Sequence, residues 1–553
     1  MITSLLVKKG VRRIVVCPGS RNAPLVRNFS ECPDIECTPV TDERSAGFYA
    51  LGMALATEKP VAVCVTSGSA LLNVAPAVSE AYYRGVPLVV ISADRPQEWI
   101  DRMDGQTIKQ TGALHNIVKG SCSVCDYKRD DFTKHEFASL QLNMTFNKAL
   151  SGYKGPIHIN VHLDEPLFDF TEDTLPDAKD IKVVGMGSVV GKDVQEIIHR
   201  FITAERRMIV VGQLAVHDKE VDRLLRELGK YFIVINEPLA ADNSVPIDIV
   251  IDSHGKSMVR MTVDFILSLG GTFVSKSFRK FLRSCSVAEH WEVNCDATLH
   301  DTFSCQTGAV CSEVKPFLKA LLLIAETEKY DASAERMAFE EVWHDALTAT
   351  ENDIEEYIPP FSQMMAVRKF ELSLDDMEYD FQVHYANSME VRLACLYAQH
   401  YVWCNRGVNG IEGSMSTAAG FSLASDDMVF CVTGDLSFFY DQNALWNARL
   451  GGNLRVLLLN NGGGGIFDML KGLDNRNDSI AYIAGNHRTD AHGICEQNDV
   501  GYLSAHNEEE YRMALVRFLT EKTSRPMVLE VFTNRQTDCL AMENMKRFIE
   551  NNY

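Results

Sequence analysis

The sequence predicts an α/β protein built from doubly wound parallel sheets. Short apolar runs of strand length recur along the chain, and each ends in a turn before a segment with helical character. Runs of this kind are typical of strands that are buried on both faces in a parallel sheet. A length of 553 residues suits roughly three such domains, each with its own core. We therefore expect three domains, over residues 1–165, 180–350 and 360–553.

The first domain is predicted from strands that alternate with helices. A small-residue helix, Ser45–Ala56, follows the second strand directly. Alternation of this kind predicts a parallel sheet, whose ligands bind beyond the carboxyl ends of the strands. Glu43 stands at such an end, although a glutamate there is often only a solvent-facing carboxylate at a helix start. The expected strands are Arg13–Cys17, Cys37–Thr41, Val61–Thr66 and Leu88–Ser92.

Two segments without sustained periodicity indicate domain boundaries. Asp164–Asp177 is acidic and contains prolines, and Glu351–Ser362 leads from acidic residues into a proline pair. Between them we expect another α/β unit, which contains no GxGxxG dinucleotide fingerprint. We interpret this central domain as chiefly structural. Its predicted elements are strands over Arg207–Val211 and Phe232–Ile235 and an amphipathic helix over Asp218–Gly229.

The last domain contains the most informative pattern. An apolar strand, Asp427–Thr433, runs into Gly434-Asp435. A helix is expected over Asp441–Leu450, and a second strand, Leu454–Leu459, then ends on Asn460-Asn461 and four glycines. In a β-α-β crossover, Asp435 and Asn461 would meet at the tips of neighbouring strands.

The residue types at these two tips predict a site for a metal ion and a diphosphate. A carboxylate, an amide oxygen and a loop carbonyl are hard ligands that suit Mg²⁺, whose remaining positions go to phosphate and water. The glycines allow positive φ and close approach of backbone to a phosphate. Either half alone is also explained as a glycine-rich turn without a ligand, but the paired spacing of Asp435 and Asn461 favours the metal–diphosphate site.

Composition excludes several other classes of protein. The formal net charge of −21 argues against nucleic acid as a partner. Fifteen cysteines are scattered without a secretory pattern, as in a reduced, cytoplasmic protein. Cys122 and Cys125 form a lone CxxC, which indicates ordinary buried thiols rather than zinc. No apolar run reaches the ~18 residues needed to cross a membrane.

These segments resemble the thiamine-diphosphate-dependent decarboxylase and carboligase superfamily. More narrowly, they resemble the 2-succinyl-5-enolpyruvyl-6-hydroxy-3-cyclohexene-1-carboxylate synthase family of menaquinone biosynthesis. The resemblance spans nearly the whole chain, with the middle third least marked. Gly434-Asp-Leu-Ser437 departs from the superfamily's usual Gly-Asp-Gly but looks like this family's own variant. The other marks are Pro18–Leu25, Asp42–Arg44, Thr66–Asn73, Ser92–Pro96, Asn387-Ser388, Asn405–Gly407, Gly410–Gly413 and Ser416–Gly420.

The resemblance implies a thiamine-diphosphate-enzyme fold and roles for particular residues around the cofactor. Glu43 matches the catalytic glutamate that hydrogen-bonds the cofactor's pyrimidine, and Ile411 matches the apolar residue that holds the cofactor bent. Asp435, Asn461 and the Gly463 carbonyl match the ligands of Mg²⁺ or Mn²⁺. The remaining residues implied to bind the cofactor are Gly413, Gly434, Leu436, Ser437 and Ile466.

The resemblance also implies the reaction and its substrates. The family decarboxylates 2-oxoglutarate and adds the resulting succinyl group to isochorismate by conjugate addition. Both substrates carry two carboxylates, which suit guanidinium forks. For any single arginine, a surface ion pair is the alternative interpretation. Ile466 and Phe467 are implied to form an apolar wall, and the polar residues implied to bind substrate are Ser20, Arg21, Arg95, Gln106, Lys276, Ser388, Arg392 and Arg406.

The assembly and the function leave alternatives at this point. The resemblance implies a homodimer or a dimer of dimers, with the first and third domains of different subunits gripping one cofactor, but an intramolecular clamp also fits the sequence. Another thiamine-diphosphate carboligase or decarboxylase, such as an acetolactate-synthase relative, is the second candidate. A catalytically silent binder would not need Glu43, Asp435 and Asn461 together. An NAD-dependent dehydrogenase would need a dinucleotide loop that is missing.

Overall fold

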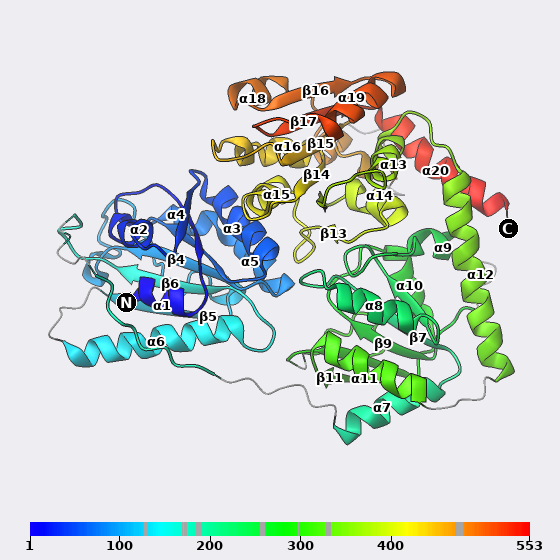
Figure 1. Cartoon of the computed structure of the whole chain (residues 1–553), viewed down its shortest axis with the longest axis horizontal. Helices are drawn as coiled ribbons and strands as arrows, with labels where there is room; N and C mark the ends of the chain where they lie inside the picture. Colours follow the sequence, from blue (N-terminus) through cyan, green and yellow to red (C-terminus); the bar gives the residue numbers. More distant parts are fainter. Residues whose placement is uncertain are drawn as a thin grey trace.

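The chain folds around three parallel β-sheets, which follow one another along the sequence in the computed structural model shown in Figure 1. The structure describes residues 1–125, 131–168, 170, 174–183, 191–254, 260–296, 298–327, 333–469 and 479–552. Every strand pairing in the three sheets is parallel. The predicted class, α/β with three doubly wound parallel-sheet domains, is therefore confirmed.

The first sheet has the strand order β2-β1-β3-β4-β6-β5, and its four predicted strands are present within two residues of their expected bounds. Its strands are β1 (Arg13–Val16), β2 (Glu36–Pro39), β3 (Val61–Val65), β4 (Leu88–Asp94), β5 (Gly120–Cys125) and β6 (Ile157–His162). The surrounding helices are α1 (Ile2–Lys8), α2 (Ala23–Ser30), α3 (Glu43–Thr57), α4 (Ser69–Asn73), α5 (Ala75–Arg84) and α6 (Phe132–Leu150), with 3₁₀ turns η1 (Gln97–Trp99) and η2 (His115–Ile117).

The central sheet has the order β11-β10-β9-β7-β8 and contains the predicted strands and helix. Its strands are β7 (Arg207–Val211), β8 (Ile233–Asn236), β9 (Phe265–Leu269), β10 (Glu289–Asn294) and β11 (Gly308–Cys311). Its helices are α7 (Lys192–Thr203), α8 (Lys219–Leu228), α9 (Ile247–Ser253), α10 (Lys276–Ser284), α11 (Val314–Thr327) and α12 (Ala334–Glu356).

The third sheet has the order β13-β12-β14-β15-β17-β16, which repeats the order of the first sheet strand for strand. Its strands are β12 (Phe381–Tyr385), β13 (Val402–Trp403), β14 (Met428–Gly434), β15 (Leu454–Asn460), β16 (Gly501–Ala505) and β17 (Met527–Phe532). Its helices are α13 (Gln363–Leu374), α14 (Met389–Tyr397), α15 (Ser414–Ser422), α16 (Asp435–Tyr440), α17 (Ser479–Ala484), α18 (His492–Gln497), α19 (Glu508–Thr520) and α20 (Arg535–Asn551), with 3₁₀ turns η4 (Gln442–Leu445) and η5 (Gly465–Met469).

The first and third domains are joined by a pair of helices, α3 and α15, that cross face to face (Figure 1). Asp42 begins α3 by accepting hydrogen bonds from the backbone N–H groups of Arg44 and Ser45. Residues Ser45 to Leu55 of α3 are buried on every side. A helix that is apolar all round belongs in a core, and one hydrophobic cluster accordingly runs through both domains.

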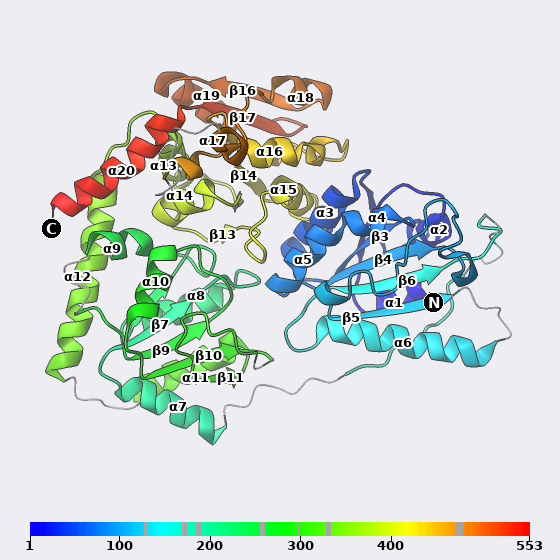
Figure 2. The same cartoon turned by 180° about the vertical axis from the view of Figure 1, so that it is seen from behind.

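The second boundary segment differs from the expectation. Helix α12 continues to Glu356, so the first half of the predicted linker Glu351–Ser362 is helical. Its last turns pack on α9 and α20, as Figure 2 shows from behind, and this packing stabilises helix where acidic composition suggested a loop. Of the other predicted linker, Asp164–Asp177, residues 169 and 171–173 lie outside the described residues.

The predicted helix over Asp441–Leu450 is wrong. The chain instead forms α16 directly after Gly434, then η4. The Asp441 carboxylate is fully buried and accepts hydrogen bonds from the Ser416 backbone N–H (2.7 Å) and hydroxyl (2.7 Å). These two bonds fix the chain where a new helix was expected to begin.

Among the described helices, none has both the length and the hydrophobicity that crossing a bilayer requires.

Candidate active site

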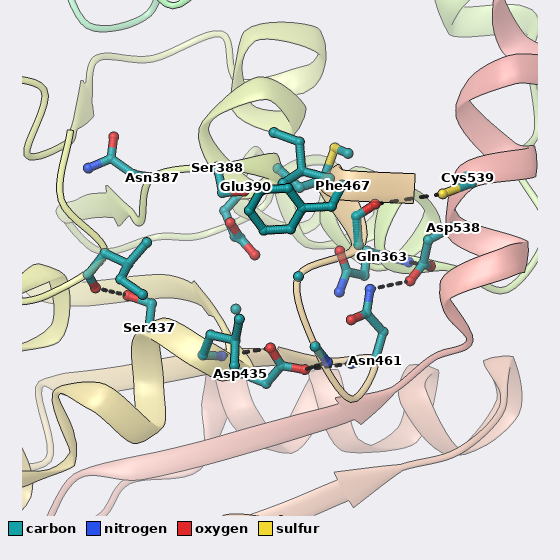
Figure 3. Close-up of a pocket in the computed structure, with 18 of the residues that line it drawn as sticks. Gln363, Asn387, Ser388, Glu390, Asp435, Ser437, Asn461, Phe467, Asp538 and Cys539 are labelled. Carbon is teal, nitrogen blue, oxygen red and sulfur yellow. Dashed lines mark hydrogen bonds between the residues drawn. The ribbon is translucent and has the colours of Figure 1, made fainter. Parts of the chain in front are cut away.

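A cavity of about 260 Å³ opens at the carboxyl edge of the third sheet (Figure 3). Strands β14 and β15 are hydrogen-bonded neighbours in which Gly434 pairs with Leu459, so their tips deliver Asp435 and Asn461 to the same place. This confirms the predicted meeting of the two strand tips. The lining residues that the sequence singled out are Ser388, Ile411, Gly434, Asp435, Leu436, Ser437, Asn461, Gly463, Ile466 and Phe467.

Asp435 organises the glycine loop. Its Oδ2 accepts hydrogen bonds from the backbone N–H groups of Asn461 (3.1 Å), Gly462 (2.8 Å) and Gly463 (2.9 Å). Its Oδ1 accepts from the N–H of Leu436 (2.6 Å). Burial raises the pKa of Asp435, while the nearby His487 and the loop N–H groups act in the opposite direction. The carboxylate thus holds the loop against the tip of β14.

The donor set fits a hard cation. The Asn461 Oδ1 is buried and has no hydrogen-bond partner among the described residues, and an unsatisfied buried amide oxygen costs about 1–3 kcal/mol unless a donor or cation reaches it. Among the described residues, the Gly463 carbonyl accepts one hydrogen bond, from the Gly465 N–H (2.9 Å), which leaves its second lone pair for a cation. Gly462 and Gly463 have φ of 81° and 150°, which favour glycine. Carboxylate, amide and carbonyl oxygens together suit Mg²⁺ or Mn²⁺.

Of the two residues in the Gly410–Gly413 segment that were expected to bind the cofactor, only Ile411 lies on the cavity. Its side chain is 41% exposed, and its carbonyl accepts a hydrogen bond from the Ser437 hydroxyl (2.5 Å). Gly413 does not line the cavity. It has a φ of 78° at the start of α15, where an added Cβ would stand 2.3 Å from the Phe48 ring. Its geometry serves the packing of α15 on α3.

Two predicted substrate arginines lie beside the cavity rather than in it. The Arg392 guanidinium donates to the backbone carbonyl of Ser388, which has a φ of 89°. Arg406 is 7% exposed and donates to the Oδ1 of the cavity residue Asn387 (3.0 Å). Burial lowers the pKa of Arg392, and the positive charge of Arg406 adds to this effect. The cavity therefore has a cationic border.

Lys276 approaches this border from the central domain. It is the first residue of α10 and is exposed. The turn just before it contacts the arginine border, because Arg406 donates to the Phe273 carbonyl (3.4 Å) and Thr272 donates to the Arg406 carbonyl (3.0 Å). The predicted lysine is thus placed near the third domain's arginines, although it does not line the cavity.

The remaining predicted substrate residues gather at the carboxyl edge of the first sheet. The Arg21 side chain is buried and donates to the Leu163 carbonyl (3.2 Å) and the Glu165 carboxylate (3.1 Å). Arg95 donates twice to the Gly105 carbonyl (3.1 and 3.0 Å). Ser20 and Gln106 are exposed in neighbouring turns.

Glu43 is the first residue of α3, and its carboxylate accepts a hydrogen bond from Asn73 (3.1 Å). Within the described ranges, neither Glu43 nor any first-domain residue lines the cavity of the same chain. The structure therefore gathers the predicted site residues into two groups, one on the first domain and one on the third domain, with Lys276 of the central domain near the second group.

Six lining residues were missed by the sequence reasoning: Gln363, Met389, Glu390, Ile483, Asp538 and Cys539. Glu390 is buried beside Gly434, and burial together with the Asp435 charge raises its pKa to about 8. Its position two residues after the Asn387-Ser388 mark was a usable signal. Gln363 and Asp538 reach the cavity from helices remote in sequence, where no motif marks them.

Comparison with known proteins agrees with this division. Residues 1–119 match the family model "Thiamine pyrophosphate enzyme, N-terminal TPP binding domain", and residues 387–531 match "Thiamine pyrophosphate enzyme, C-terminal TPP binding domain". The first matched range contains Glu43, and the second contains most of the residues that line the Asp435 cavity.

Curated relatives match over almost their whole length. A 2-succinyl-5-enolpyruvyl-6-hydroxy-3-cyclohexene-1-carboxylate synthase of Phocaeicola vulgatus is 37% identical over 100% of this chain and 98% of its own. Proteins of the same name from Bacteroides thetaiotaomicron and Bacteroides fragilis are 37% and 38% identical, over 98% and 100% of this chain and 97% and 98% of their own. The chain is a thiamine-diphosphate-dependent enzyme that belongs to the 2-succinyl-5-enolpyruvyl-6-hydroxy-3-cyclohexene-1-carboxylate synthase family.

Proposed function

We propose that the enzyme decarboxylates 2-oxoglutarate and adds the succinyl group to isochorismate, forming 2-succinyl-5-enolpyruvyl-6-hydroxy-3-cyclohexene-1-carboxylate for menaquinone synthesis. The observation that carries the proposal is the cavity of Asp435 and Asn461 bordered by Arg392 and Arg406. It combines a cation and diphosphate site with guanidinium groups for dicarboxylate substrates. The relatives' names support the same product, and none of the names given above points to an acetolactate-type reaction.

The third domain holds the diphosphate end of the cofactor in this proposal. Asp435, Asn461 and the Gly463 carbonyl are the ligands of Mg²⁺ or Mn²⁺, which neutralises the diphosphate. Gly434, Leu436 and Ser437 lie against the phosphates, and Ile411 and Ile466 support the rings. Thiamine diphosphate, when bound, supplies the stabilised carbanion that decarboxylation leaves behind.

In this proposal Glu43 exchanges a proton with the cofactor, and the basic residues bind the carboxylates of the substrates. Glu43 shares its proton with the pyrimidine N1′ of the cofactor, as a general acid and base. Arg392, Arg406 and Lys276 bind carboxylates on one side, while Ser20, Arg21, Arg95 and Gln106 bind them on the other. Ser388 orients the substrate, and Phe467 keeps water away from the carbon atoms that become bonded.

A second copy of the chain completes the site in this proposal. Glu43 and the first-domain arginines do not line the cavity of their own chain, within the residues described. A homodimer, or a dimer of dimers, brings the first domain of one copy to the third domain of the other. We place the reaction in the cytoplasm, because fifteen scattered cysteines are typical of a reducing compartment.

The test incubates the purified protein with thiamine diphosphate, Mg²⁺, 2-oxoglutarate and isochorismate. We expect isochorismate absorbance to fall and the adduct mass to appear only when 2-oxoglutarate is present. Asp435→Ala, which removes a cation ligand, is the negative control. Consumption of pyruvate with unchanged isochorismate would overturn the proposal in favour of an acetolactate-type carboligase.

A further inference from the structure

The first turn of α20 forms part of the cavity wall, although it lies beyond the part of the chain that the family model matches. That match ends at residue 531, and α20 begins at Arg535. Asp538 and Cys539 of this turn line the cavity (Figure 3). The turn therefore adds residues to the site that lie outside the region matched by the family model.

Asp538 is held in place by three donors from different elements. Its Oδ1 accepts from the backbone N–H of Gln363 at the start of α13 (2.8 Å). Its Oδ2 accepts from the Thr533 hydroxyl (2.9 Å) and from the Nδ2 of Asn461 (2.9 Å). The Gln363 donor is backbone and the Thr533 donor lies five residues away, so these two bonds fix the carboxylate independently of the glycine loop.

The hydrogen bond to Asn461 decides which way its amide points. A carboxylate only accepts hydrogen bonds, so the amide must turn its NH₂ group toward Asp538. The Asn461 Oδ1 then points away from Asp538 toward the cavity, as Figure 3 shows. This is the oxygen that is buried without a partner among the described residues.

A second side chain of the same turn holds the other end of the loop. Arg535 forms two hydrogen bonds with the Asp468 carboxylate of η5, at 2.8 Å and 2.7 Å. Its guanidinium also donates to Asn486. Two-point pairing of this kind fixes geometry as well as distance. The segment from Asn461 to Asp468 is thus tied to α20 at both ends.

We propose that Asp538 is the positioning residue of the cation site: it orients the Asn461 amide so that Oδ1 faces the cation. The inference rests on the proposed function, which makes Asn461 a cation ligand. Partners that orient metal ligands typically change metal affinity by about 10–100-fold when they are removed. In this proposal Asp538 acts through its hydrogen bond to Asn461 and is not itself a ligand of the cation.

The experiment measures the Mg²⁺ concentration that gives half-maximal binding of thiamine diphosphate, by calorimetry, without any turnover. In Asp538→Asn, the new side chain can accept the hydrogen bond from the Gln363 N–H only with its oxygen. Its NH₂ group then faces Asn461 and donates to the Asn461 Oδ1, which is no longer free for the cation. We expect the required Mg²⁺ concentration to rise about 10–100-fold. Glu543→Gln, one turn further along α20 in an exposed pair with Arg547 (3.2 Å), is the matched control and should leave it unchanged.

The reciprocal exchange Asp538→Asn with Asn461→Asp separates orientation from general damage. In this double variant the introduced asparagine donates its NH₂ group to one oxygen of the introduced aspartate and leaves the other oxygen for the cation. Mg²⁺ dependence should therefore return to within roughly threefold of the original. A merely structural role for Asp538 predicts no such recovery. If the single variant does not fold, the exchange variant alone still tests the orientation.

The outcomes distinguish this inference from the proposed function. If the unaltered protein binds no thiamine diphosphate with Mg²⁺, the proposed function fails. If it binds and folded Asp538→Asn requires the same Mg²⁺ concentration, only the positioning role is overturned. The positioning role is also overturned if the exchange variant requires as much Mg²⁺ for thiamine diphosphate binding as Asn461→Ala does.

Discussion

At the scale of single residues, the hydrogen-bond partners of each predicted site residue decide whether its side chain is free to bind a ligand. Arg21 has the expected identity and strand-end position, but it is already paired with Glu165, whose side chain is 70% exposed. Because Glu165 lies largely in solvent, our proposal is that a substrate carboxylate takes its place on Arg21. Asn461 differs from Arg21, because its buried Oδ1 has no hydrogen-bond partner among the described residues and so needs none to be displaced.

Glu43→Gln should abolish turnover while thiamine diphosphate binding stays within a few-fold of the original. Glutamine keeps the size and a hydrogen bond but cannot exchange the proton, and general acid–base groups contribute about 10²–10⁴-fold. Steady-state assay and calorimetry check the two parts. Glu58→Gln, exposed at the other end of the same helix, is the control. Turnover near the original level in Glu43→Gln would show that this carboxylate has no catalytic role.

His384 makes stability depend on pH. Burial lowers its pKa to about 3, and the Arg84 charge contributes in the same direction. An unfolded histidine titrates near 6.5, so on acidification the unfolded chain takes up a proton that the folded chain refuses. Below roughly pH 6.5, this residue should therefore lower the free energy of unfolding by about 1.4 kcal/mol for each pH unit, until the pH reaches the pKa of His384 in the folded protein.

His384→Phe should cancel this loss. The ring lies among Trp403 (6.0 Å) and Phe421 (4.9 Å), and the Nε2 atom has no partner in the described part of the chain. Urea unfolding at pH 7.5, 6.5 and 5.5 should show that the free energy of unfolding of the variant increases relative to that of the original protein as the pH falls. A constant difference across these conditions would contradict the assignment of His384 as a buried neutral group.

At the scale of elements, two glycines allow α3 and α15 to cross closely. A Cβ on Gly420 would stand 2.1 Å from the Tyr49 carbonyl, and one on Gly52 would stand 2.0 Å from the Thr417 carbonyl. Both obstacles are backbone atoms, which cannot rotate aside. Since this crossing lies within the core shared by the first and third domains, its spacing fixes how the two domains sit together.

Gly420→Ala should destabilise the protein by about 1–3 kcal/mol or more, because the added methyl forces the two helices apart. Gly493→Ala is the matched control, since this helical glycine has no atom within 4 Å of an added Cβ. Alanine there should be neutral or slightly stabilising. Chemical unfolding of the two variants measures the difference, and equal stability would show that the crossing tolerates a methyl group.

At the scale of the whole molecule, each complete site needs two chains in our proposal. Glu43→Gln and Asp435→Ala should each be inactive alone. In mixed dimers one of the two sites receives an intact Glu43 from one chain and an intact Asp435 from the other. Random reassortment should therefore restore roughly a quarter of the original activity. Dissociation and reassociation of mixed variants, followed by assay, checks this; no recovery in confirmed heterodimers would favour a site within one chain.

The sequence by itself determined the parallel α/β class, the strands that carry Asp435 and Asn461, and the family motifs. Buried parallel strands are continuous apolar runs, and their polar tips stand out against them. Only the tertiary structure decided that α16 and η4 form in place of the helix expected over Asp441–Leu450, that Gly413 packs against Phe48, and that Asp538 accepts a hydrogen bond from Asn461. These outcomes depend on contacts between segments far apart along the chain, and no local periodicity or composition records such contacts.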